Sequence, residues 1–261
     1  MKKILLPSIT LVLLIIAGIE GYILLQPTEA THLLSGVASS SAQIVHTEKG
    51  EHYSIMVAFP DRTPLYSRIN PAADERARTA IETWLQDSIA QFKKSIDFSD
   101  APADYREMIE QTDRQFMYQA TYRAAIGEGG KLTSYAYTIF ADTGGAHPNT
   151  YYHTFVFDRS GHSLAIDDLF VSGSDYLGRL SQEATKQVTA ELGKRLDMNP
   201  ENAIFAEGLS PTADNFKNFF VEDDTLVILI PPYQAAAYVA GTFEVRIPLA
   251  SLRDILKPEW K

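Results

Sequence analysis

The sequence contains no cysteine. This absence excludes disulfide bonds, thiolate metal sites and the lipid-modified start of a lipoprotein, so the fold must be stabilised by its hydrophobic core. A chain of 261 residues can bury enough apolar surface for that purpose. Three signatures of metal or nucleotide chemistry are missing as well: an HExxH zinc-binding helix, an EF-hand calcium loop and a P-loop.

Basic residues are scarce relative to acidic ones. The chain has 23 Lys and Arg against 33 Asp and Glu, which gives a formal net charge of −10 at pH 7. Residues 1–30 contain two lysines and two glutamates, so the chain beyond them has the same net charge. Such a surface disfavours nucleic acid and anionic lipid as partners. It favours a basic partner, although solubility explains the charge more simply.

The only long apolar run lies at the N-terminus. It extends from Ile4 to Leu25 and follows two lysines, a pattern typical of an export signal whose basic end stays in the cytoplasm. Its length is close to the roughly 20 residues that cross a bilayer as a helix, and Glu20 lies near the outer end. We therefore expect a single-pass membrane anchor within residues 1–30, with the domain outside the cytoplasm, periplasmic or extracellular. The alternative is a signal peptide cleaved near Ala30, which would release a secreted domain.

The chain after this segment divides into a linker and two subdomains. Residues 31–45 are rich in Ser, Ala and Gly and predict a short linker. A strand at 52–59 and a helix capped by Asn70 open the first subdomain, residues 46–154. The acidic segment 97–113 shows no clear periodicity, and we expect it to be irregular.

Alternating side chains predict three consecutive strands with short connections, which form an antiparallel meander at 116–124, 132–140 and 151–157. The second subdomain, residues 155–261, is expected to repeat the arrangement of a helix and strands. Its predicted elements are a helix from about Ser174, strands at 216–221, 225–230 and 242–247, and a helical turn at 249–256. Because strands and helices do not alternate regularly, the pattern indicates an α+β fold: antiparallel sheets with packed helices, in two small subdomains.

The segment from Gly144 to Asn149 is the most distinctive motif in the chain. Gly144 and Gly145 permit positive φ and close backbone approach, and Pro148 biases His147 towards an extended conformation. An imidazole held in this way could bind a ligand or a metal, or transfer a proton. The alternative is a tight hairpin whose histidine caps a carbonyl.

Other polar residues suggest further chemistry. His153 and His162 could complete a metal site with His147, but His153 follows the aromatic face of its strand, which favours a packed side chain. Asp167 and Asp168 could form a carboxylate pair for sugar chemistry. Adjacent residues of an extended chain point to opposite faces, however, so a role at the start of a turn or helix is favoured.

Two tyrosines flank a run of small residues between Pro231 and Gly241. Such tyrosines suit a recognition surface, or a loop packed flat on the domain. The candidate ligand-binding residues are therefore Gly144, Gly145, His147, Pro148, Asn149, Tyr233 and Tyr238. No catalytic residue, metal ligand or cofactor is predicted.

Five motifs occur in an order that resembles a known family. They are Gly144–Asn149, Asp167–Phe170, Asn215-Phe216, Pro231–Gly241 and Val245–Pro248. Together they resemble the paired extracytoplasmic domains of unknown function in PdaC-type peptidoglycan deacetylases and in RsiV-type anti-sigma factors, which sense lysozyme. The resemblance covers about residues 48–256, and the motifs are specific only in combination.

The resemblance implies a non-catalytic binding or sensing module of the cell envelope. In the deacetylases the chemistry belongs to a separate metal-dependent domain with an HxxxH motif, which this sequence lacks. In the anti-sigma factors a cytoplasmic segment holds the sigma factor, whereas only Met1–Lys3 precede the apolar run here. The implied partner is peptidoglycan or a cationic, lysozyme-like protein. The alternative is a cell-wall glycan hydrolase or deacetylase that uses the His147 loop.

Overall fold

The computed structural model describes residues 43–62, 70–196 and 199–261. They belong to one compact unit, Ser40–Lys261. No helix among the described residues is long and apolar enough to cross a membrane. The predicted anchor within residues 1–30 and nearly all of the predicted linker lie outside the described residues, so anchoring and the alternative of cleavage stay predictions.

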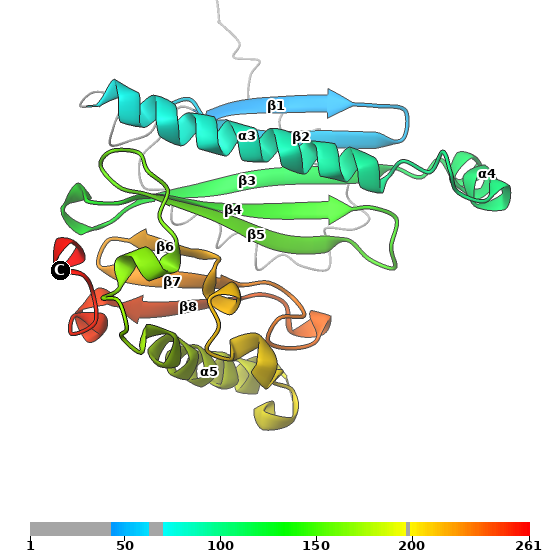
Figure 1. Ribbon diagram of the computed structural model, residues 1–261. Helices are drawn as coiled ribbons and strands as arrows, with labels where there is room; N and C mark the ends of the chain where they lie inside the picture. Colours follow the sequence, from blue (N-terminus) through cyan, green and yellow to red (C-terminus); the bar gives the residue numbers. More distant parts are fainter. Residues whose placement is uncertain (1–42, 63–69, 197–198) are drawn as a thin grey trace, which may run out of the picture. The chain divides into compact units, whose positions relative to one another are not determined.

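Five strands form the larger sheet, in the order β1-β2-β3-β4-β5 (Figure 1). Their bounds are Gln43–Lys49 for β1, Tyr53–Pro60 for β2, Phe116–Ile126 for β3, Thr133–Asp142 for β4 and Asn149–Phe157 for β5. Strands β3, β4 and β5 confirm the predicted antiparallel meander. Strands β2 and β3 run parallel, because the long connection through α3 (Pro71–Ser95) and α4 (Ala103–Thr112) brings the chain back to the same end.

Three strands form the smaller sheet, which is antiparallel and follows the order β6-β7-β8. Their bounds are Phe219–Glu222 for β6, Thr225–Ile230 for β7 and Phe243–Pro248 for β8. The helix α5 (Tyr176–Arg195) precedes them. Helices combined with two mostly antiparallel sheets confirm the predicted α+β class.

The two long helices begin where polar caps predict. The side chain of Asn70 accepts a hydrogen bond from the Ala73 N–H at 3.2 Å, and Pro71 occupies the first helical position of α3. In α5 the cap is Asp175, one residue beyond the predicted start, and it accepts from the Gly178 N–H at 3.2 Å. Each cap satisfies one of the N–H groups that a helix start leaves without a partner.

Two elements differ from the sequence-based expectation. The segment expected to be irregular contains α4, and the end of the expected linker contains the start of β1. Only Ile109 of α4 is buried, so this helix has no apolar stripe to mark it. Strand β1 lies at the edge of its sheet and is mostly exposed, so its sequence lacks the alternation of a half-buried strand.

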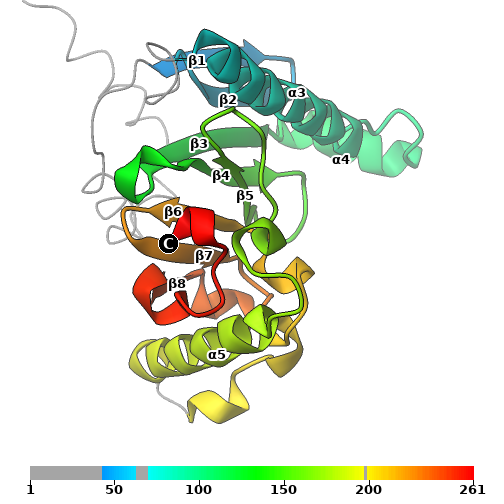
Figure 2. The same cartoon turned by 60° about the vertical axis from the view of Figure 1, so that its left-hand side comes forward.

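Side chains of different size cover the two faces of the larger sheet. On one face, Tyr135 and Tyr137 pack with an aromatic cluster beneath α3. On the other face, the small residues Ala125, Ser134 and Ala136 belong to the core shared with the smaller sheet. Helix α5 covers the smaller sheet on its far side, so the layers follow the order α3, larger sheet, smaller sheet, α5 (Figures 1 and 2).

The two sheets are joined by direct hydrogen bonds. The Ser134 hydroxyl donates to the Val221 carbonyl and accepts from the Val221 N–H, both at 3.1 Å. These bonds join β4 to β6 in a buried position, where an unmade bond would be costly. The predicted boundary between residues 154 and 155 falls inside β5, and the assignment of two subdomains stays a prediction.

Candidate functional site

The loop between β4 and β5 is held in a fixed turn. Gly144 has a φ of 92°, and a Cβ at that position would lie 2.9 Å from a ring carbon of Phe116. The Gly144 N–H donates to Asp142 at 3.0 Å, and the Arg114 guanidinium donates to the Gly145 carbonyl at 3.3 Å. Glycine is therefore required at position 144 by both conformation and space. The turn presents His147 to solvent.

The loop between β7 and β8 is held by hydrogen bonds to the chain that precedes β6. The side-chain amide of Gln234 donates to the carbonyls of Gly208 and Asn215, both at 2.9 Å. The Phe205 N–H donates to the Ala235 carbonyl at 2.7 Å, and Ala235 is buried. These bonds fix the base of the loop, while the neighbouring Tyr233 stays exposed.

Tyr233 adopts a conformation that is unusual for a tyrosine. Its φ is 69°, in the left-handed region, and 52% of the residue surface is exposed. A non-glycine residue in this region costs of the order of 1 kcal/mol or more, and such strain persists only where the surrounding structure enforces it. Core packing gives no reason for the strain, because the side chain lies at the surface.

The two loops meet, although 86 residues separate the two side chains in contact. The His147 Nε2 atom lies 2.9 Å from the Tyr233 hydroxyl, and the Tyr238 hydroxyl donates to the Pro148 carbonyl at 3.1 Å. The His147 ring stacks on the Tyr238 ring with centroids 3.9 Å apart and an interplanar angle of 26°. Two segments that the sequence singled out separately are thus parts of one surface.

The three rings form a flat aromatic platform, a name used below for His147, Tyr233 and Tyr238. The centroids of His147 and Tyr233 are 6.1 Å apart at an interplanar angle of 23°, too far for face-to-face contact. Their hydrogen bond joins the edges, so the two rings lie side by side. The Tyr238 ring stacks on His147, and its centroid lies 5.5 Å from that of Tyr233 at a tilt of 34°.

The remaining candidate residues have simpler roles. Gly144 and Gly145 shape the turn, and Asn149 is the exposed first residue of β5, opposite Ala141 in the sheet register. The structure therefore brings together His147, Pro148, Tyr233 and Tyr238. Whether these residues bind a ligand stays a prediction.

The other two histidines near the loop in sequence do not join His147. His153 stacks on Trp84 with centroids 4.3 Å apart and an interplanar angle of 9°, which confirms a packed side chain. Burial, together with the nearby Lys217 cation, lowers the pKa of His153 to about 4. His162 is exposed, 3.5 Å from Asp158. Within the described ranges, no three His, Asp or Glu side chains gather closely enough to hold a metal ion.

Part of the chain matches a known protein family. Residues 167–250 match the family described as "Protein of unknown function (DUF3298)". The matched segment covers about a third of the chain. It supplies Tyr233 and Tyr238, whereas His147 precedes the matched residues.

Curated relatives and solved structures agree with the match. The chain is 29% identical over 188 residues to the peptidoglycan-N-acetylmuramic acid deacetylase PdaC of Bacillus subtilis, a match that covers 72% of this chain but 38% of PdaC. It is 23% identical to the esterase Rv3036c of Mycobacterium tuberculosis, over 83% of this chain and 85% of the esterase. The resemblance to PdaC-type domains of unknown function is therefore confirmed.

Two solved DUF3298 structures share the fold. A family member from Bacteroides fragilis superposes with a TM-score of 0.55 at 16% identity, covering 83% of this chain and 93% of the other. A member from Pseudomonas aeruginosa gives a TM-score of 0.53 at 15% identity, covering 86% and 98%. At these identities the likeness establishes the fold alone.

Asp168, near the start of the matched segment, has a structural role. The Asp168 carboxylate accepts from the Ala165 N–H at 2.9 Å and begins the short 3-10 helix Ile166–Leu169. The Asp168 carbonyl also accepts from the Trp260 indole at 2.9 Å. The expected role of Asp168 at the start of a turn is confirmed.

Sequence reasoning missed the residues that hold the platform. Asn215 belongs to a recognised motif, but only the structure shows that its amide donates to the carbonyls of Glu207 and Ser210 while its own carbonyl accepts from Gln234. Gly208 is required there, because a Cβ would overlap the Gln234 backbone. The available signals were the Asn215-Phe216 motif and a glutamine between two tyrosines.

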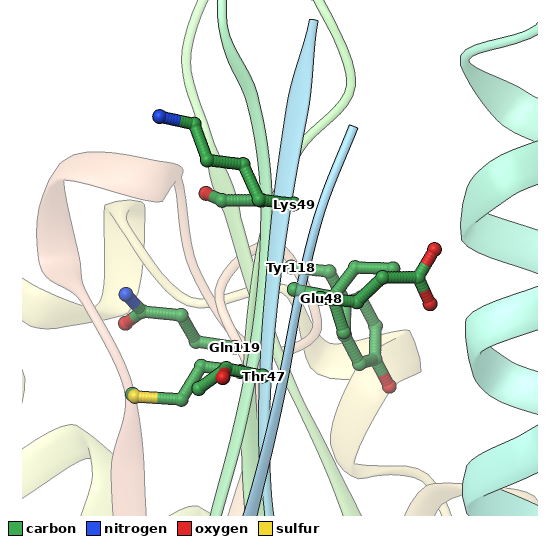
Figure 3. A pocket seen from close by; sticks show the side chains of 8 residues that line it. Thr47, Glu48, Lys49, Tyr118 and Gln119 are labelled. Carbon is green, nitrogen blue, oxygen red and sulfur yellow. The ribbon is translucent and has the colours of Figure 1, made fainter. Parts of the chain in front are cut away.

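A hollow of about 340 Å³ lies on β1, β2 and β3, towards the β1 edge of the larger sheet. Figure 3 shows that Glu48 and Tyr118 point to the side of α3, whereas Lys49 and Gln119 point to the opposite side of the sheet. Its polar groups therefore do not converge on one point, as they do in a built ligand site.

Proposed function

We propose that this chain is a binding or sensing module of the cell envelope, placed outside the cytoplasm, and that the aromatic platform is its contact surface. The relationship to PdaC supports a role at the envelope, since that relative is named for its action on peptidoglycan. This chain spans 38% of PdaC, so the activity of the whole relative does not transfer to it.

The observation that supports the proposal most strongly is the construction of the platform. Two loops from different sheets are fixed independently, one by a glycine turn and the other by partly buried amide hydrogen bonds, and both carry exposed aromatic rings. Tyrosines presented on a rigid base provide large contact area at low entropic cost, as in many recognition surfaces. A strained Tyr233 backbone at an exposed position is typical of a site selected for contact.

The partners that we propose are peptidoglycan and a cationic, lysozyme-like protein. The formal net charge of −10 favours the protein partner through faster association. The relationship to PdaC favours the glycan. The two partners are separated by experiment below.

A hydrolase or deacetylase that uses the His147 loop is the second candidate, and the likeness to an esterase favours it. Such chemistry would need carboxylates beside His147. Among the described residues, the contacts of the His147 side chain are instead the rings of Tyr233 and Tyr238 and the carbonyl of Pro148. Binding therefore has the better support.

A capture experiment tests the proposal. The full chain, purified in mild detergent, is incubated with insoluble peptidoglycan and, separately, with immobilised lysozyme. We expect one of the two to retain it, and Tyr233→Gly to reduce retention about tenfold or more while Met108→Ala on α4, an exposed residue outside the platform, has no effect. Equal retention of both variants would refute the platform as the contact surface.

An activity assay tests the second candidate. With divalent metal ions present, the full chain should release neither acetate nor reducing ends from peptidoglycan, and it should not hydrolyse a short-chain ester. Turnover that disappears in His147→Ala would replace the binding proposal with the hydrolase one.

A further inference from the structure

The hydrogen bonds of the platform fix which groups can still receive a ligand. The Pro148 carbonyl can only accept, so in the neutral imidazole the His147 Nδ1 atom, 2.9 Å away, donates to it. Nε2 is then an acceptor, and the Tyr233 hydroxyl donates to it at 2.9 Å. The Tyr238 hydroxyl donates to the same Pro148 carbonyl. Every side-chain donor of the platform is therefore engaged.

The groups of the platform that can still contact a ligand are electron-rich. The Tyr233 oxygen keeps acceptor capacity at the rim, because its only hydrogen is committed to His147. Tyr238 stacks on one side of the His147 ring, and both His147 and Tyr233 are exposed, so we infer that the ring faces turned away from Tyr238 are open to a ligand. The face of an aromatic ring is the negative part of its quadrupole. A ligand must therefore bring donors or positive charge, and neither an anion nor a bare carbonyl is suited.

The net charge of the chain favours a cationic ligand, and the Arg114 cation beside the platform is paired. Arg114, whose guanidinium contacts the Gly145 carbonyl, also lies 3.6 Å from Asp142 and is thereby partly neutralised. The formal net charge of the chain is −10. A cation approaching the platform therefore meets attraction from the molecule as a whole.

We propose that the platform binds the guanidinium group of an arginine side chain on a partner protein. The planar guanidinium can lie flat across two rings whose centroids are 6.1 Å apart, whereas a lysine ammonium is a compact and strongly hydrated point charge. This inference rests on the proposed binding function and names the chemistry that its surface selects.

The test compares two peptides of equal charge. The full chain in mild detergent is titrated with an acetylated, amidated peptide of alternating arginine and glycine, and with its lysine counterpart. The lysine peptide reports attraction to the acidic surface in general. We expect the arginine peptide to bind at least threefold more tightly, the size of an exposed cation–π contact. A citrulline version, which is planar but neutral, should bind more weakly than both.

Substitutions at Tyr233 test whether the platform is the source of the preference for arginine over lysine. Tyr233→Gly removes the ring and relieves the left-handed strain, so this variant should fold. It should lower the dissociation constant of the lysine peptide divided by that of the arginine peptide to about one. Tyr233→Phe keeps the ring and should retain most of the preference. Met108→Ala should leave the ratio unchanged. A ratio near one in the unmodified chain, or a ratio that survives Tyr233→Gly, would overturn the proposal.

Binding of chitin oligosaccharides tests whether the platform recognises a sugar instead of arginine. If they perturb the His147 imidazole resonances more strongly than the arginine peptide at equal concentration, the platform is a sugar site and the arginine proposal is wrong. Capture by peptidoglycan would then still support the binding function. If neither peptidoglycan nor lysozyme retains the chain but the arginine preference is observed, the proposed envelope function is refuted. The proposed arginine preference of the platform would still hold.

Discussion

Two histidines of this chain lie against aromatic rings in opposite surroundings. His153 stacks on Trp84 beneath α3, within the aromatic core of the larger sheet. His147 stacks on Tyr238 at the surface, where two loops meet. The contacts have similar centroid separations, 4.3 and 3.9 Å, so ring stacking by itself does not distinguish a packed residue from a site residue.

The difference lies in the backbone and in the hydrogen bonds. His153 belongs to β5, in register with Tyr137 of β4, so the regular geometry of a strand sets its position. His147 is set by a glycine turn and is bonded at both ring nitrogens. A ring that is oriented by several specific contacts while it stays exposed is typical of a site. A ring that is oriented by its strand is typical of a core.

Removing the ring under His153 should have the largest effect. Trp84 also contacts Tyr137 and Phe155, with centroids 4.9 and 5.7 Å away. Trp84→Ala should therefore lower the free energy of unfolding by about 3 kcal/mol, measured by urea denaturation. A loss below about 1 kcal/mol would mean that the aromatic cluster is not a core.

The second-largest effect should come from acid, through the partly buried His153. The folded-state pKa of His153, about 4, lies below its ordinary value of 6.5, so the unfolded state takes up a proton first as the pH falls. Stability should be full above pH 6.5 and decrease towards pH 4. The loss should reach about 2 kcal/mol, less than the whole shift implies because the ring is partly exposed. His153→Phe keeps the stack and should lack this component. Identical pH profiles of the two proteins would contradict the assignment.

The base of the platform should matter less for stability than for binding. Gln234→Ala removes two hydrogen bonds and leaves the carbonyls of Gly208 and Asn215 without this donor, at a cost of about 1.5 kcal/mol. The same variant should weaken retention by whichever partner the chain binds, because Tyr233 loses its fixed base. Retention equal to that of the unmodified chain would show that the loop is held without Gln234.

The exposed histidine should contribute least to stability. His147→Ala should change the free energy of unfolding by less than about 1 kcal/mol, as expected for a surface substitution, and should still alter binding. Urea denaturation of both proteins gives the comparison with Trp84→Ala directly. A loss of about 3 kcal/mol would show that His147 is a structural residue.

Local signals allowed much of the fold to be predicted. The cap at Asn70 and the alternation along β3 to β5 are set by neighbouring residues, so the helix and the meander followed from the sequence. Helix α4 and strand β1 did not, because both are mostly exposed and leave no periodic pattern. The parallel pairing of β2 with β3 depends on a long crossover, which local pattern does not specify.

The same limit applies to the candidate site. The glycines beside His147 and the tyrosines around Gln234 marked two loops, each through its own composition. Their meeting depends on how the two sheets pack, which is decided by small residues on β4 such as Ser134. The sequence therefore predicted the parts of the platform and not the contact between them.

Because the small side chains of β4 let the sheets approach, each sheet contributes one loop to a surface that neither could form alone. A chimaera that exchanged one half for that of a distant homologue would need to preserve the edge contact between His147 and Tyr233 as well as its own core. Substitutions on one loop thus constrain those that the other can accept. Positions 147 and 233 should accordingly change together as such proteins diverge, although 86 residues separate them along the chain.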